Sequence, residues 1–271
     1  MLVRHACALS LALGACAEPP VRWSESPVTV PAPATEMHFA FDSSGNVHWR
    51  PLDPAPSTLP ASSIVCPGSV RVARVGVREI YAVWWSPRAD SSAALIAARS
   101  RDNGRSWPDV APVDTADRAI QGCRRPAASI AADASRGYVH VAYWLVGPEA
   151  PGIFFAHSTP GPFMFHAPVP IIYGERPGQT SIAASGDVVV VAYEDPNGRH
   201  PRVGLAVSRT LGHTFDHRMQ VSTGTGAAVQ PRVAIAGGTV AVAWQNRRGP
   251  IGGPAADPGP TMVRFGELSG S

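Results

Sequence analysis

A strand-like pattern recurs four times in this 271-residue chain, and the long period of the repeat is the strongest constraint on the fold. Each copy is a run of β-branched and small residues that contains an aromatic side chain, at residues 80–85, 139–144, 188–193 and 240–244. The aromatic residues that mark the copies are 59, 50 and 51 residues apart: Trp84, Tyr143, Tyr193 and Trp244. A shorter apolar run precedes each copy across a turn, and a third run follows the first three copies. One small antiparallel sheet per repeat, at this period, predicts a β-propeller.

The strand runs alternate little between apolar and polar residues, which indicates strands that are covered on both faces. Each blade of a propeller lies between two other sheets, whereas a sandwich has no such long period. A hairpin at residues 38–42 and 46–49 precedes the four full repeats, and we expect it to pair with the C-terminal repeat and close the ring. The prediction is an all-β propeller of four to five blades over residues 36–271.

Residues 100–107, directly after the third strand of the first repeat, read Ser-Arg-Asp-Asn-Gly-Arg-Ser-Trp. The aspartate can accept hydrogen bonds from its own turn, and the glycine can supply a positive φ. This pattern resembles the Asp-box, Ser-x-Asp-x-Gly-x-Thr-Trp, of the sialidase-like (BNR-repeat) propellers, on four residues: Ser100, Asp102, Gly104 and Trp107. A copy at residues 208–215 has Thr210 in place of the aspartate, and a shorter, more eroded copy lies at 158–163. The resemblance covers residues 64–245 and implies a sialidase-like propeller with fewer than the usual six blades.

The N-terminus is typical of an export signal. Arg4 and His5 precede an apolar run, residues 6–15, that is too short to span a bilayer. Residues 13–16, Leu-Gly-Ala-Cys, resemble the processing box of bacterial lipoproteins, which implies removal of residues 1–15 and lipid attachment to Cys16. Residues 16–35 contain many prolines and are expected to form an extended tether to the membrane. The predicted location is the bacterial cell envelope, at the outer membrane or the periplasmic face.

Two cysteines remain in the predicted exported domain, Cys66 and Cys123. In an exported protein an even pair favours a disulfide, and two unrelated buried thiols are the alternative. A disulfide across a loop of this size would stabilise the fold by about 4 kcal/mol by constraining the unfolded chain.

The resemblance also implies which residues sialidase catalysis would need. Those enzymes hold the substrate carboxylate with three arginines, and they use a tyrosine activated by a glutamate together with an acid/base aspartate. Arg88 and Asp90 fall in the loop where the family often places an arginine and its acid. Arg125 and Arg232, which begin later blades, are candidates for ligand binding.

Two parts of the family pattern are missing. The first family arginine, in an Arg-Ile-Pro motif, has no counterpart, because residues 66–69 read Cys-Pro-Gly-Ser. Tyr193 and Glu194 are adjacent on one strand and therefore point to opposite faces, so they cannot form the coupled pair. The Asp-box itself is a structural turn in that family and identifies the fold rather than an activity.

Composition excludes several other chemistries. The chain has 23 basic residues, all of them arginine, which excludes a phosphate-loop lysine, a Schiff-base enzyme and a Ser-x-x-Lys catalyst. The 20 acidic residues and the absence of a basic block argue against a nucleic-acid partner. His213 and His217, with Asp216 between them, lack a third ligand in their loop, so neither a metal site nor a cofactor is predicted.

Two functions are compatible with these observations. The first is a lipid-anchored propeller that binds a glycan or a protein, or serves as a scaffold, because loops on a rigid ring form recognition surfaces. The alternative is a divergent glycoside hydrolase, similar to exo-sialidases, that uses Arg88 and Asp90. Three arginines converging on one pocket beside an acid and a tyrosine would favour the hydrolase.

Overall fold

The computed structural model describes residues 19–31, 37–198, 200–224, 226–247 and 259–269, which form strands and turns and contain no helix. Accordingly, none of these residues belongs to a helix that could span a membrane. The predicted signal peptide, Cys16 and most of the insert at residues 249–260 lie outside the described residues. The all-β prediction is confirmed.

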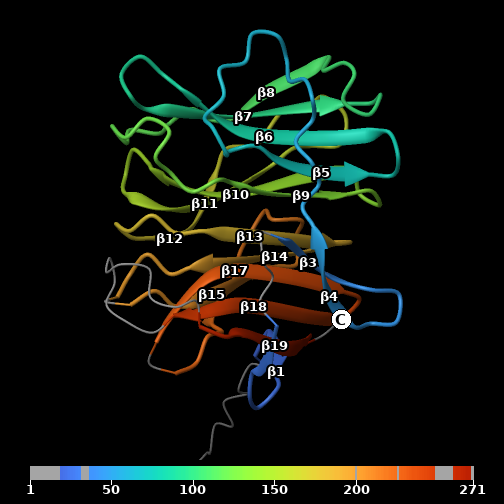
Figure 1. Cartoon of the computed structure of the whole chain (residues 1–271), viewed down its shortest axis with the longest axis vertical. Helices are drawn as coiled ribbons and strands as arrows, with labels where there is room; N and C mark the ends of the chain where they lie inside the picture. Colours follow the sequence, from blue (N-terminus) through green and yellow to red (C-terminus); the bar gives the residue numbers. More distant parts are fainter. Residues whose placement is uncertain (1–18, 32–36, 199, 225, 248–258, 270–271) are drawn as a thin grey trace, which may run out of the picture.

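Four antiparallel sheets, here called blades I to IV, follow one another along the chain and correspond to the four repeats (Figure 1). Blade I consists of β5 (Arg71–Val75), β6 (Glu79–Pro87), β7 (Ala93–Ser100) and β8 (Asp109–Asp114). Blade II consists of β9 (Ser129–Asp133), β10 (Tyr138–Val146), β11 (Pro151–His157) and β12 (Val169–Tyr173). Blade III consists of β13 (Thr180–Ser185), β14 (Val188–Glu194), β15 (Val203–Ser208) and β16 (His217–Gln220). Blade IV consists of β17 (Ala227–Ala236), β18 (Thr239–Arg247) and β19 (Thr261–Leu268), with β1 (Val21–Trp23) and β2 (Val28–Val30) added from the N-terminus.

The blades pack face to face, as the repeat predicts. The first strands of successive blades lie side by side, in the order β5, β9, β13 and β17. The second strand of each blade is covered on both faces: on β14, Val191 packs toward blade II, whereas Val190 packs toward blade IV. Trp84 and Trp85 of β6 likewise belong to two different apolar clusters and are almost fully buried. Sheets that share faces in succession beside a common set of first strands make a propeller rather than a two-layer sandwich.

Blade IV is completed by strands from the N-terminal end of the chain. Strand β1 pairs with β19 through Val21↔Leu268 and Trp23↔Gly266, and β2 pairs with the opposite end of β19. Residues 21–23 and 28–30 are therefore strands of the propeller, and the prediction of an extended tether over residues 16–35 is wrong for them. The backbone N–H and C=O groups of β19 gain partners along this edge, which would otherwise be open.

The predicted N-terminal hairpin forms, as β3 (Met37–Phe41) and β4 (Val47–Pro51), but it does not pair with the C-terminal repeat. It is a sheet of its own that packs Phe39 and Trp49 on the face of blade IV. Asp53, two residues after β4, lies 3.6 Å from Arg74 of β5, so this segment also reaches blade I. The described residues thus form four full blades and a two-stranded unit that packs on blade IV and is linked to blade I through Asp53.

The connection between β7 and β8 forms the turn that its sequence predicts. The carboxylate of Asp102 accepts hydrogen bonds from the backbone N–H and the hydroxyl of Ser106 and from the Ser100 hydroxyl, at 2.7–2.8 Å. The bonds from Ser106 hold the pKa of Asp102 at about 2. Gly104 has a φ of +83°, and the indole N–H of Trp107 donates to the carbonyl of Thr58. Trp107 thereby helps to cover the outer face of blade I.

The connection between β15 and β16 keeps this geometry although its aspartate is lost. The hydroxyl of Thr210 accepts the backbone N–H of Thr214 at 3.0 Å, and the Ser208 hydroxyl accepts that of Gly212 at 2.9 Å. Gly212 has a φ of +89°, and a Cβ there would lie 2.2 Å from the Phe155 ring. Position 212 therefore requires glycine for both its backbone conformation and its close approach.

Candidate functional site

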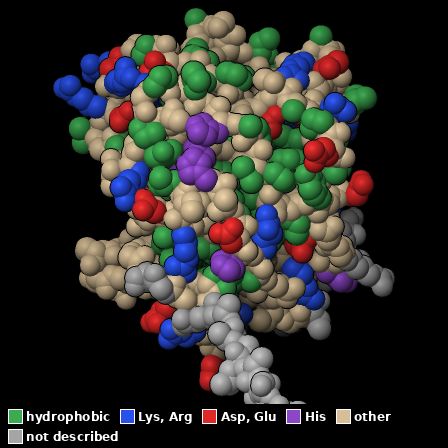
Figure 2. Space-filling view, turned by 180° about the vertical axis from the view of Figure 1, so that it is seen from behind, with side chains coloured by type: hydrophobic (Ala, Val, Ile, Leu, Met, Phe, Trp, Pro, Cys, Tyr) green, Lys and Arg blue, Asp and Glu red, His purple; other side chains and the backbone are tan. Residues whose placement is uncertain are grey.

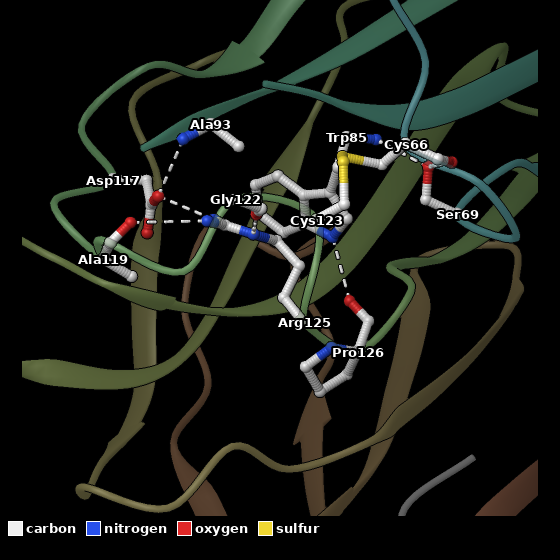
Figure 3. The surroundings of a disulfide bond; sticks show 10 residues. All are labelled: Cys66, Ser69, Trp85, Ala93, Asp117, Ala119, Gly122, Cys123, Arg125 and Pro126. Atoms are coloured by element: carbon white, nitrogen blue, oxygen red, sulfur yellow. Dashed lines mark hydrogen bonds and ion pairs between the residues drawn. A yellow bond between two sulfur atoms is a disulfide. The ribbon is translucent and has the colours of Figure 1, made fainter. Parts of the chain in front are cut away.

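Arg125 is the arginine whose surroundings are most informative (Figure 3). Its guanidinium lies 2.6 Å from a carboxylate oxygen of Asp117, and the two side chains are 0% and 1% exposed. A further guanidinium N–H donates to the carbonyl of Gly122, and the group lies 5.0 Å from the ring of Trp85. Arg125 is therefore held inside the protein and is not positioned to meet a ligand.

Asp117 is the acceptor that organises this region. Besides Arg125, its carboxylate accepts the backbone N–H of Ala93, where β7 begins, and that of Val146, where β10 ends. The same side chain thus joins blades I and II through one buried carboxylate.

A disulfide joins Cys66 to Cys123 beside this ion pair (Figure 3). It links the segment that precedes blade I to the connection between blades I and II, with a Cα–Cα distance of 5.2 Å. The backbone N–H of Cys66 donates to the carbonyl of Trp85, and the Trp85 indole N–H donates to Pro126. The disulfide and the ion pair therefore hold the same end of blades I and II.

Arg88 and Asp90 lie in the neighbouring loop, between β6 and β7. Asp90 accepts hydrogen bonds from the Ser92 hydroxyl at 2.6 Å and from the Ser92 backbone at 2.9 Å, and these bonds lower the pKa of Asp90. Arg88 donates to the carbonyl of Thr115 at 2.8 Å. A carboxylate whose pKa is lowered and which closes its own turn is poorly suited to act as a general acid.

Arg232 lies on β17 and faces the hairpin unit. Its guanidinium donates to the carbonyl of Met37 in β3 and to that of Pro231. Arg88 and Arg125 belong to adjoining loops of blades I and II, whereas Arg232 bonds to a different part of the ring. The three arginines singled out from the sequence do not converge on one pocket.

Tyr193 and Glu194 point to opposite sides of β14, as the strand geometry requires. Tyr193 packs between blades II and III, and burial raises its pKa to about 12. Glu194 accepts the backbone N–H of Gln230 at 2.7 Å and that of Gln179 at 3.3 Å. Burial raises the pKa of Glu194, whereas the hydrogen bonds from these two backbone N–H groups act in the opposite direction. Its burial could not be inferred from sequence, because it depends on the bulge in β17 at Gln230.

A shallow cavity of about 310 Å³ lies between the N-terminal strand and the edge of blade III. One wall is formed by Trp23 of β1, whose indole N–H is buried and has no hydrogen-bond partner. The opposite wall comes from β16 and the residue before it, with polar side chains at Asp216, His217, Arg218 and Gln220. An aromatic wall facing several hydrogen-bonding groups is a lining that suits a polar ligand such as a sugar.

Three histidines meet at the end of blades II and III that lies away from Glu194. The sequence pattern linked only one of them, His213, to a metal. His157, His166 and His213 have ring nitrogens within 4.8 Å of one another. His213 was considered with its sequence neighbours Asp216 and His217, but the structure places it beside residues of blade II instead. Burial lowers the pKa of His157 to about 4, with smaller contributions from His213 and His166. His140, on the neighbouring strand, is fully buried, and burial lowers its pKa to about 3.

Comparison with known proteins gives remote structural likenesses. No protein-family model matches this chain, and no curated protein does. Among solved structures, a Hadza microbial sialidase is 14% identical with a TM-score of 0.46, over 67% of this chain and 42% of its own. A Trypanosoma rangeli sialidase in complex with the inhibitor DANA is 13% identical with a TM-score of 0.47, over 82% of this chain and 39% of its own. A xylan β-1,4-xylosidase from Bacillus halodurans is 11% identical with a TM-score of 0.47, over 89% of this chain and 52% of its own.

The chain spans only about half, or less, of each of these three proteins. Because their TM-scores lie below 0.5, the propeller assignment depends on the sheet order and packing of this chain itself. The sialidase and xylosidase activities are those of the neighbours.

Proposed function

We propose that this chain is an exported, lipid-anchored propeller of the Asp-box type that binds a glycan or a protein, or serves as a scaffold, in the bacterial cell envelope. The observation that carries the proposal is the burial of Arg125 in its ion pair with Asp117. A sialidase-like site needs several arginines free to hold a carboxylate. Arg88 and Arg232 also donate to backbone carbonyls, and they do so in different parts of the ring.

The cavity beside Trp23 supports a binding role. Trp23 offers an aromatic side chain on one wall, and His217 and Gln220 line the opposite wall. The cavity lies at the end of the chain from which the lipid anchor would extend, so a ligand there would be held close to the membrane surface.

Binding is tested by applying the full chain to a glycan array and then measuring the masses of the bound glycans. We expect retention of one glycan class at its original mass, weakened by the double substitution His217→Ala with Gln220→Ala. His48→Ala, on β4, serves as the matched control and is expected to bind normally. Shortened glycans would contradict a pure binding role, whereas retention that the double substitution leaves unchanged would place the ligand elsewhere.

Membrane attachment is tested by Cys16→Ser. Because the cysteine thiol is the lipid acceptor in bacterial lipoproteins, the substituted protein should leave the membrane fraction and appear in the soluble fraction. Immunoblots of the two fractions provide the measurement, and substitution of Cys7, in the predicted discarded segment, is the control. Undiminished membrane association of the Cys16→Ser protein would contradict the anchor.

A second function is favoured by one observation, the raised pKa of Glu194 at the loop end of blade III. In many glycoside hydrolases the general acid is a carboxyl group whose pKa is raised by its surroundings. Both of its oxygens, however, accept backbone N–H groups, which fits a structural role equally well. The substitution Glu194→Gln separates the two roles, because a hydrolase would lose turnover while a binding protein would keep its ligand.

A further inference from the structure

The three histidines between blades II and III come from separate parts of the chain that the fold brings together. His157 is the last residue of β11, His166 lies in the connection from β11 to β12, and His213 lies in the turn between β15 and β16. His166 and His213 are exposed, and Figure 2 shows histidine side chains next to one another on one face of the molecule. The site is independent of the proposed ligand-binding function.

The backbone fixes the position of each of these residues. The N–H of His166 donates to the carbonyl of His157 at 3.0 Å, next to an isolated bridge between Ser158 and Phe165. The N–H of His213 donates to the carbonyl of Thr210, inside the turn that Gly212 and the Ser208 hydroxyl stabilise. A rigid Asp-box-like turn thus presents a histidine at a position where the intact copy has Arg105.

His157, the buried member of the three, has a ring nitrogen that lacks a hydrogen-bond partner. His157 is 3% exposed, and its Nε2 atom is buried without a hydrogen-bond partner. A buried polar atom that lacks a partner is costly, and a metal ion or a water molecule would satisfy it. The ring centroids of His213 and His166 lie 4.6 and 4.7 Å from the ring centroid of His157, so two further imidazoles lie beside it.

We propose that His157, His166 and His213 bind one Zn²⁺ ion that joins blades II and III. Three imidazoles are a common protein ligand set for zinc, with a solvent molecule in the fourth position. Nitrogens at zinc-bond distance in a tetrahedron are about 3.4 Å apart, and the ring nitrogens here lie within 4.8 Å. Closing this difference requires rotation of the two exposed side chains, His166 and His213. The fourth position would face solvent, on the side of His166 and His213.

The test is calorimetric titration of ZnCl₂ into the full chain, purified without a histidine tag and treated first with a chelator. We expect one saturable site per chain, and His166→Gln and His213→Gln should each weaken it by at least about tenfold. His217→Gln, four residues from His213 and also exposed, is the matched control and should leave the affinity unchanged. Both ligand substitutions are at exposed side chains, so the variants are expected to fold.

A second measurement confirms that the same residues hold the ion. Zinc should raise the unfolding temperature of the parent chain and of His217→Gln, but not that of the double substitution His166→Gln with His213→Gln. In the presence of chelator all of these proteins should unfold at similar temperatures. Absence of saturable binding to the parent chain would overturn the proposal, as would parent-like affinity in the double variant.

Discussion

Replacing Asp117 by alanine is expected to lower the free energy of unfolding by about 3–5 kcal/mol, because it leaves the buried guanidinium of Arg125 without its counter-ion. The substitution also removes the acceptor for the backbone N–H groups of Ala93 and Val146. Urea unfolding of the full chain, followed by tryptophan fluorescence, measures the change.

The matched control is Asp187→Ala. Asp187 pairs with Arg136 at 2.8 Å, but both side chains are about half exposed. Exposed ion pairs contribute about 0–1 kcal/mol, so this substitution should have little effect. A loss for Asp117→Ala as small as that for Asp187→Ala would mean that Arg125 reaches solvent and is free to bind a ligand.

Removing the disulfide should have an effect of comparable size. The double substitution Cys66→Ala with Cys123→Ala is expected to cost about 4 kcal/mol, because the two cysteines are 57 residues apart and their bond restricts the unfolded chain. Urea unfolding with and without reductant measures this loss, and reductant should not alter the stability of the double variant further.

The state of the two thiols is read directly by mass spectrometry after alkylation without reduction. Protein recovered from an oxidising compartment should show no alkylation at Cys66 or Cys123. Two alkylated thiols in that sample would show that the bond does not form. Because Cys123 is two residues from Arg125, the effects of removing the disulfide and removing Asp117 are not expected to add.

The blade architecture could be predicted because its cause is visible in single strands. A strand buried on both faces needs apolar residues at consecutive positions, and the four runs marked by Trp84, Tyr143, Tyr193 and Trp244 have them at a regular period. The turn at Asp102 was predictable for a similar reason, since the hydrogen bonds to the Asp102 carboxylate all come from Ser100 and Ser106.

The completion of blade IV could not be predicted in the same way. Strands β1 and β2 have three residues each, too few for a periodic pattern, and they pair with a strand more than 200 residues away. The proline-rich composition around them suggested an extended tether. These residues become strands because they pair with the edge of β19, and that edge exists only in the folded protein.

The candidate sites depended on tertiary placement even more strongly. Arg125 precedes a proline shortly before the first strand of blade II. The sequence at this position does not distinguish an arginine that binds a ligand from one that is buried in an ion pair. Its partner Asp117 lies eight residues earlier in an irregular connection. His157 and His213 are in different blades, so sequence proximity pointed to His217 instead. A loop sequence contains few local patterns, and the burial of a loop side chain depends on the residues that pack around it in the folded protein.

The central functional claim is that this propeller recognises a ligand without cleaving it. The most direct test is the release of the fluorogenic group from a sialoside by the purified full chain, compared with buffer. The arrangement of Arg88, Arg125 and Arg232 predicts no release above the buffer rate. Steady release by the parent chain that is lost in Glu194→Gln would contradict the claim and establish the chain as a glycoside hydrolase.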